Sequence, residues 1–225
     1  HSTSRRQRQM CIRDSQELAL DDLQTNSEIE VYSISNILQN SIYFVNSNLE
    51  RIVNSPSITN WNITGIQRLL DLALNSTNYV ADGYYLLDRN GTLVTFTGIN
   101  KEQYAPFKGI NLSHRDYFQI PKLNGTLYTS TVIESNDSVP RIYISFPITR
   151  SNNTELLDPA VDLQQSRSNS TSFKGVVVAS IAAKTLGNFL ESQLHPKFNG
   201  EIGFLDRDGT ITVSYTHLRA HETSQ

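Results

Sequence analysis

The chain has 225 residues, 38% of them hydrophobic, and a formal net charge of −3. That length allows one large domain, or one domain with part of a second, and the apolar content is sufficient for a packed core. A charged fraction of only 18%, a negative net charge and the lack of a basic patch argue against nucleic-acid binding and suit an exported protein.

Both ends of the chain resemble translated sequencing adapters of the transposon type. Residues 5–15 read RRQRQMCIRDS and residues 213–223 read VSYTHLRAHET, and the nucleotide runs that encode them are reverse complements. We therefore interpret 1–15 and 213–225 as adapter artefacts and exclude them from the fold prediction. The insert 16–212, which we expect to be cut from a longer gene, has 14 basic and 20 acidic residues, hence a net charge of −6. It has no cysteine, which excludes thiol catalysis and disulfides.

The first element of the insert is a long helix. Residues 16–54 contain neither Pro nor Gly, and apolar residues recur at steps of three and four, which is the period of one helix face. The pattern predicts a signalling helix over 16–55 that ends before Pro56. At 1.5 Å per residue it would span about 60 Å, a length typical of a helix that rises from a membrane span. Its apolar stripe consists of Val31, Ile34, Leu38, Ile42, Val45, Leu49 and Ile52.

A second helix and a β-hairpin follow. Thr64 and Gln67 have the spacing of a capping box, which predicts a helix that begins near Thr64 and ends within 75–78. Two β-rich runs, 83–87 and 92–96, then flank Asn90-Gly91, a pair of residues that tolerates positive φ and is typical of a tight hairpin turn.

Strands alternate with a polar insertion in the remainder of the chain. Strands are predicted over 128–133, 141–148 and 174–181, and a Ser- and Asn-rich surface insertion over 150–173. A helix over 183–194, stopped before Pro196, leads to a further hairpin. Both hairpins contain Leu-Asp-Arg-x-Gly-Thr, with their aspartates 118 positions apart, at Asp88 and Asp206. This internal repeat predicts an α+β fold made of two similar modules, the second of them truncated.

Three segments resemble the double Cache family of extracytoplasmic sensor domains. They are Asp82–Phe96, then Gly109-x-x-x-Ser113-His114-Arg115-Asp116-Tyr117-Phe118, and Gly175–Ile181. The resemblance implies a long helix carrying a PAS-like antiparallel sheet module at 56–182, distal to the membrane. A linking helix and the first hairpin of a truncated proximal module would follow at 183–212.

The same resemblance implies a role in signalling. Such domains sit outside the cell membrane, bind a small molecule, and drive a histidine kinase or a chemoreceptor, commonly as homodimers through the long helix. The resemblance implies no cofactor and no catalysis by this segment. With only two His residues in the insert and no Cys, zinc ligation by His and Cys is not expected either.

The candidate ligand site centres on Arg115. A guanidinium binds a carboxylate through two parallel hydrogen bonds, and flanking rings exclude water from that contact. Two other interpretations stay open: Arg115 could cap a helix or pair with an acid, and the aromatic residues could be core. Besides Arg115, the resemblance and the strand pattern give as candidate ligand contacts Tyr117, Phe118, Tyr128, Ser130, Tyr143 and Ser180.

The candidate site departs from that of amino-acid-binding members of the family. Those members place acids where this chain has Ser130 and Ser180, and an aromatic residue where it has Ile110. A hydroxyl is a poor partner for a dehydrated ammonium group. A free α-amino acid is therefore disfavoured as the ligand, and a carboxylate, another small metabolite or no direct ligand at all remains open.

Two other functions remain open at this level. Eight Asn-x-Ser/Thr triplets are typical of a glycosylated surface protein, so a structural or adhesive role is the main alternative. The triplets begin at Asn62, Asn75, Asn90, Asn111, Asn124, Asn136, Asn152 and Asn169. A hydrolase would require a nucleophile and a base, and the chain has no nucleophile elbow, zinc-protease motif or phosphate-binding loop.

Overall fold

A computed structural model describes residues 2–77, 80–99, 102, 105–135, 137–150, 172–193, 201–205 and 211–216. Most of the predicted insertion, 151–171, and the predicted stop at Pro196 lie outside the described residues. The elements are α1 Ser2–Val53, α2 Pro56–Thr59, α3 Ile63–Ser76, β1 Gly83–Asp88, β2 Leu93–Gly98, the 3₁₀ helix η1 Ala105–Phe107, α5 Asp116–Asn124, β3 Tyr128–Thr129, β4 Ile133–Glu134, β5 Pro140–Arg150, β6 Ser172–Ala182, α6 Ala183–Gln193, β7 Glu201–Leu205 and β8 Ile211–Thr216.

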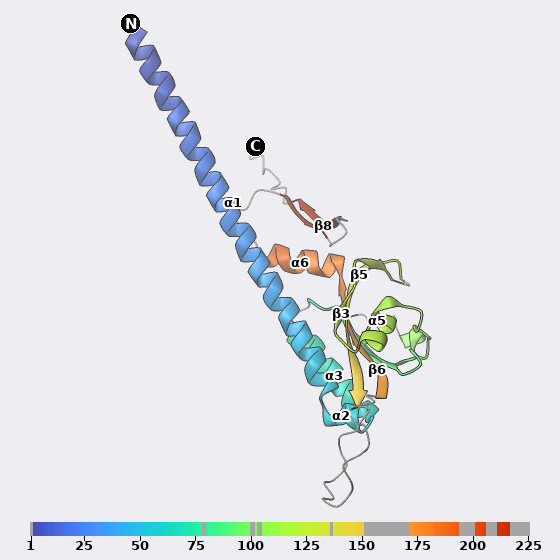
Figure 1. Cartoon of the computed structure of the whole chain (residues 1–225). Helices are drawn as coiled ribbons and strands as arrows, with labels where there is room; N and C mark the ends of the chain where they lie inside the picture. Colours follow the sequence, from blue (N-terminus) through green and yellow to red (C-terminus); the bar gives the residue numbers. More distant parts are fainter. Residues whose placement is uncertain are drawn as a thin grey trace, which may run out of the picture.

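An antiparallel sheet forms the centre of the molecule. Its strand order is β2-β1-β6-β5-β3, with β4 also paired to β5, and a separate two-stranded sheet joins β7 to β8. Helices α1 and α3 pack on one face of the main sheet, and α5 packs on the other (Figure 1). The predicted α+β class, with a long N-terminal helix and an antiparallel sheet module, is confirmed.

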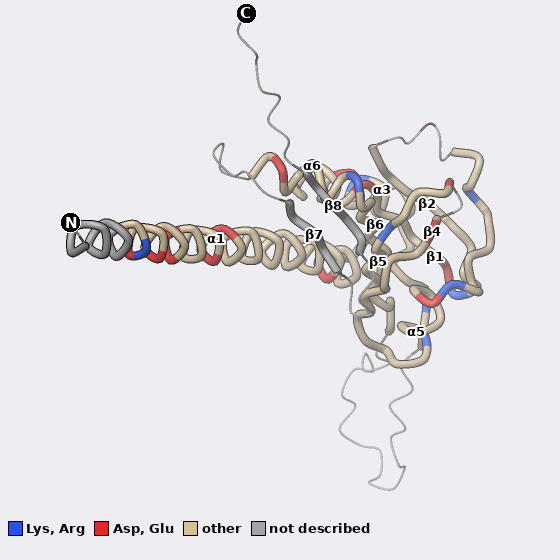
Figure 2. Tube along the Cα trace, turned by 90° about the horizontal axis from the view of Figure 1, so that it is seen from above, with Lys and Arg blue, Asp and Glu red and all other residues tan. Residues whose placement is uncertain are grey.

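Helix α1 is longer than the sequence pattern predicts. It begins at Ser2, within the run interpreted as adapter, because that run contains no helix breaker either, and it ends at Val53. Ser55 then caps α2, whose first residue is Pro56. Of the predicted stripe, Ile34, Val45, Leu49 and Ile52 are buried, but Val31 is 65% exposed. That part of the prediction is wrong because α1 projects beyond the sheet there (Figure 2).

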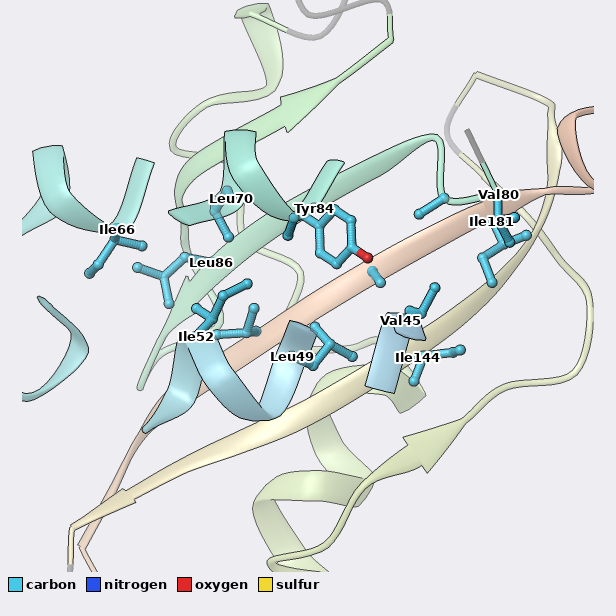
Figure 3. Close-up of a cluster of buried hydrophobic side chains, with 14 of the residues drawn as sticks. Val45, Leu49, Ile52, Ile66, Leu70, Val80, Tyr84, Leu86, Ile144 and Ile181 are labelled. Carbon is cyan, nitrogen blue, oxygen red and sulfur yellow. The ribbon is translucent and has the colours of Figure 1, made fainter. Parts of the chain in front are cut away.

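The main core lies between α1, α3 and the sheet. Figure 3 shows side chains from all three meeting, including Leu49 of α1, Leu70 of α3 and Tyr84 of β1. All three have no exposed surface. Alternate residues of a strand point to opposite faces, so Leu86 joins this core while its neighbours on β1 point toward α5.

Two local predictions need correction. Helix α3 is capped by Asn62, whose side chain accepts a hydrogen bond from the Gly65 amide, so Thr64 is not the cap. The side chain of Gln67 instead reaches across to bond the backbone carbonyl of Phe96 on β2. The end of α3 at Ser76 falls within the predicted range.

The β1–β2 turn is also built differently from a two-residue Asn-Gly hairpin. Only Gly91 has a positive φ, of 81°. The Asp88 carboxylate accepts hydrogen bonds from the amides of Asn90 and Thr92 and holds the turn. A Cβ at Gly91 would lie 2.6 Å from the Ser113 backbone, so this turn requires glycine.

The internal repeat is visible in the strand register. Leu87 pairs with Leu93 after a register shift in the first hairpin. In the second hairpin Leu205 pairs with Ile211 after a shift at the equivalent point, each residue 118 positions later. The two hairpins are therefore built alike.

Candidate functional site

A cavity of about 100 Å³ lies on the α5 side of the main sheet. Its walls come from β1, β2, β5 and β6, from the start of α5, from the segment before it, and from the turn between β4 and β5. Typical pockets for drug-sized ligands hold about 300–1,000 Å³. The cavity therefore suits a ligand of only a few heavy atoms.

Arg115 lines this cavity from the N-terminus of α5. Its backbone is extended and takes the N-cap position, but its side chain makes no capping hydrogen bond. The Arg115 amide donates to the Leu112 carbonyl, which closes the turn that leads into the helix. Of the two other interpretations left open for this residue, helix capping by the side chain is therefore wrong.

Three tyrosine rings form one wall of the cavity. The rings of Tyr117 and Tyr143 lie 4.6 Å apart, and Tyr85 is 6.4 Å from each in an edge-to-face arrangement. Burial raises the pKa of all three phenols above the ordinary 10.0. The rings therefore present neutral, largely dehydrated surfaces.

A buried charged cluster occupies another part of the wall. Arg141 donates from Nε to Asp82 at 2.8 Å and from Nη1 to Asp137 at 2.5 Å. The three side chains are only 7%, 11% and 11% exposed, and all three residues line the cavity. We call Asp82, Asp137 and Arg141 the charged triad.

This triad is not predicted from the sequence. The positions at which amino-acid-binding relatives carry acids hold Ser130 and Ser180 here, whereas the acids of the cavity come from the residue before β1 and from the β4–β5 turn. One signal was available: Arg141 sits at the start of a β-rich run, two positions before Tyr143 and on the same face of the strand. A buried arginine there requires an acidic partner.

The candidate contacts predicted from the sequence divide into two groups. Arg115, Tyr117, Tyr143 and Ser180 line the cavity. Phe118 instead packs edge-on against Phe173, with ring centroids 5.7 Å apart. The Ser130 hydroxyl accepts from the Tyr143 amide and donates to the Thr131 carbonyl, so it holds the sheet edge. Tyr128 packs against the same apolar cluster as Phe118 and is not among the residues that line the cavity.

The described residues contain no group of three or more His, Cys, Asp or Glu side chains placed to hold a metal ion. None of the described helices has a stretch apolar and long enough to cross a bilayer.

Solved structures share this architecture. An extracellular ligand binding receptor from Desulfohalobium retbaense matches with a TM-score of 0.61 and 18% identity, over 84% of this chain and 30% of that one. The fold is that of a Cache-type sensor domain. The ligand-binding domain of the Campylobacter jejuni chemoreceptor Tlp3, in complex with 4-methylisoleucine, matches this chain with a TM-score of 0.56 and 14% identity, over 83% of this chain and 66% of that one. The ligand-binding domain of Mlp24 with asparagine matches with a TM-score of 0.51 and 16% identity, over 87% and 70%.

These matches are to longer chains. This chain spans about a third of the Desulfohalobium chain and about two thirds of the Tlp3 domain. No protein-family model and no curated protein sequence matches it. At identities of 14–18% the likeness concerns the fold.

Proposed function

We propose that this chain is the extracytoplasmic, ligand-sensing part of a membrane-anchored signal-transduction receptor, and that it binds a small organic molecule without transforming it. The observation that carries this proposal is the cavity, in which Arg115 and the charged triad surround a space bounded by aromatic rings. Such a mixture of apolar walls and a few fixed polar groups is typical of small-molecule sites. The solved structures with the same fold are described as an extracellular ligand binding receptor and a chemoreceptor ligand-binding domain.

The sheet offers a route from ligand to helix. On β5, Tyr143 faces the cavity and its neighbour Ile144 faces the core that α1 shares. On β6, Ser180 faces the cavity and its neighbour Ile181 faces the core. A ligand with different affinities for two arrangements of these strands would shift α1 between two positions. That shift is the signal we propose to pass along α1 toward the membrane.

Binding can be tested by isothermal titration of the 225-residue chain with hits from a thermal-shift screen of small carboxylates. We expect Arg115→Gln to weaken binding of a carboxylate hit at least about tenfold, because a charge-assisted bidentate contact is lost. The matched control is Arg68→Gln on α3, an exposed arginine far from the cavity lining. A hit whose affinity is the same in wild type and Arg115→Gln would remove Arg115 from the site.

We further propose a homodimer through α1. The projecting part of α1 carries apolar side chains that are 60–70% exposed, among them Leu18, Leu23, Ile29 and Tyr32. Burying them against a second copy would remove this surface from water. Sedimentation equilibrium of the chain tests the idea, and a monomer at every concentration would contradict it.

The five Asn-x-Ser/Thr asparagines that the structure describes are exposed: Asn62, Asn75, Asn90, Asn111 and Asn124. Asn136, Asn152 and Asn169 lie outside the described residues. Exposure makes glycosylation sterically feasible, and it is compatible with an extracytoplasmic sensor as well as with a structural surface protein. The built cavity favours the sensor.

A further inference from the structure

The cavity has two differently charged ends. One end is Arg115, at the start of α5, beside Tyr117 and Tyr143: its positive charge lowers the phenol pKa of both rings, against the larger effect of burial. The other end is the charged triad, near Tyr85 and Tyr143, where Asp82 raises both phenol pKa values and Arg141 lowers them. The tyrosine wall therefore stands between a positive end and the triad.

The strand register gives the backbone spacing between Tyr143 and the arginine of the triad. Arg141 precedes Tyr143 by two residues on the cavity face of β5, which corresponds to about 7 Å along a strand. Tyr117, which follows Arg115 on α5, stacks against Tyr143 at 4.6 Å. A ligand that contacts both ends must therefore reach across at least one ring.

The triad contains two carboxylates and one guanidinium, so the formal charge of its three side chains is −1. Arg141 bonds Oδ2 of Asp82 and Oδ1 of Asp137. Oδ1 of Asp82 is buried and accepts no hydrogen bond from the described residues. Leaving a buried carboxylate oxygen without a donor is costly. A rotation of the Asp82 side chain would offer that oxygen to a donor group placed in the cavity.

We propose that the cavity binds an extended zwitterion, with its carboxylate at Arg115 and its ammonium group, several bonds away, at the Asp82 end. This inference rests on the proposed sensing function and adds the ligand class. It revises the expectation from sequence that an amino group would find no acid. An α-amino acid, whose two charges sit on one carbon, would leave one end of the cavity without its partner.

Three matched series of probes test the separation of charges. The first contains ω-amino carboxylates with three to six carbons. The second contains the α-amino isomers of the same compounds, and the third contains the plain carboxylic acids of equal length. In titrations of the 225-residue chain, we expect one ω-amino carboxylate to bind at least about tenfold more tightly than both its α-isomer and its plain acid, a factor worth about 1.4 kcal/mol.

Two substitutions then locate the ammonium group. Asp82→Asn should reduce the preference for the ω-amino compound over its plain acid about tenfold, because the ammonium group loses its carboxylate partner, and it should not weaken binding of the plain acid. Glu134→Gln, which neutralises an exposed acid outside the cavity lining, is the matched control and should change neither. If Asp82→Asn does not fold, as judged by the lack of a cooperative thermal melt, Asp137→Asn replaces it as the test variant. That change leaves the Asp82–Arg141 pair intact. It should lower the same preference.

The failures are distinguishable. Equal binding of α- and ω-isomers, or tightest binding of the plain acid, overturns the extended zwitterion and leaves the sensing function standing. The same holds if none of the three series binds while another small molecule does. If no small molecule in a wider screen binds, the proposed function itself fails.

Discussion

The two faces of the main sheet use the same strands for opposite purposes. The face toward α1 and α3 is closed by aliphatic side chains such as Leu49 and Leu86, which have no exposed surface. The face toward α5 is closed only in part: Phe118 and Val178 fill one region, and the cavity occupies the other. Each of these strands therefore contributes one face to the hydrophobic core and the other face to a cavity lined by polar and charged side chains.

The difference shows what a strand pattern can encode. On β5, residues with even numbers are Ile142, Ile144 and Phe146, and they pack on the α1 side. The odd-numbered Arg141, Tyr143 and Ser145 face α5 and bring polar atoms into a buried layer. Burying such groups is unfavourable unless they are paired, so their presence on one face only marks that face as the one adapted for recognition.

The largest change in stability is expected from a substitution in the core between α1 and the sheet. Leu49→Ala should lower the free energy of unfolding by about 3 kcal/mol, because it removes a fully buried side chain and leaves a cavity that the core closes only in part. Urea unfolding followed by circular dichroism measures the change. Val31→Ala, on the same helix but 65% exposed, is the matched control and should change stability by less than about 0.5 kcal/mol. Equal losses in both variants would show that α1 does not divide into packed and projecting parts.

Much of this fold could be predicted from the sequence because short-range rules govern it. The spacing of apolar residues, with a period of 3.6 in helices and 2 in strands, and the turn residues together predict most elements within a few residues. These elements are α1, except for its start, and α3, β1, β2, β5, β6 and α6. Val31 was assigned to the packed stripe because periodicity reports which face of a helix is apolar, and does not report where along the helix the partner ends.

The site was predictable only in part. Arg115 and Tyr117 belong to one short sequence motif, so the resemblance predicts both of them as site residues. The charged triad joins Asp82 to Arg141 across 59 positions, and a pattern in one sequence contains no information about such a pairing. The resemblance also implies Ser130 as a site residue, but its hydroxyl accepts a hydrogen bond from the Tyr143 amide at the sheet edge. The parts of the site that depend on contacts between distant residues could therefore not be predicted from the sequence.

A smaller change in stability is expected at high pH from the buried tyrosines of the cavity face. Burial raises the phenol pKa of Tyr85, Tyr117 and Tyr143 in the folded protein, whereas the unfolded chain titrates near 10. Above about pH 10 the unfolded state thus binds fewer protons than the folded state, and stability must fall as pH rises. Their stabilising contribution is complete below about pH 10 and is lost as the pH rises toward the raised pKa values of the folded state.

Tyr117→Phe isolates one of these contributions. The variant should lose less stability than wild type between about pH 9 and 11, by about 1.4 kcal/mol, because one buried phenol no longer titrates. Tyr43→Phe on α1, a ring that is 67% exposed, should leave the pH dependence unchanged. Urea unfolding at several pH values measures both slopes. Tyr117 lines the cavity, and its ring packs against that of Tyr143. An unchanged slope in Tyr117→Phe would therefore mean that water already reaches the Tyr117 hydroxyl and that the cavity is open to solvent there.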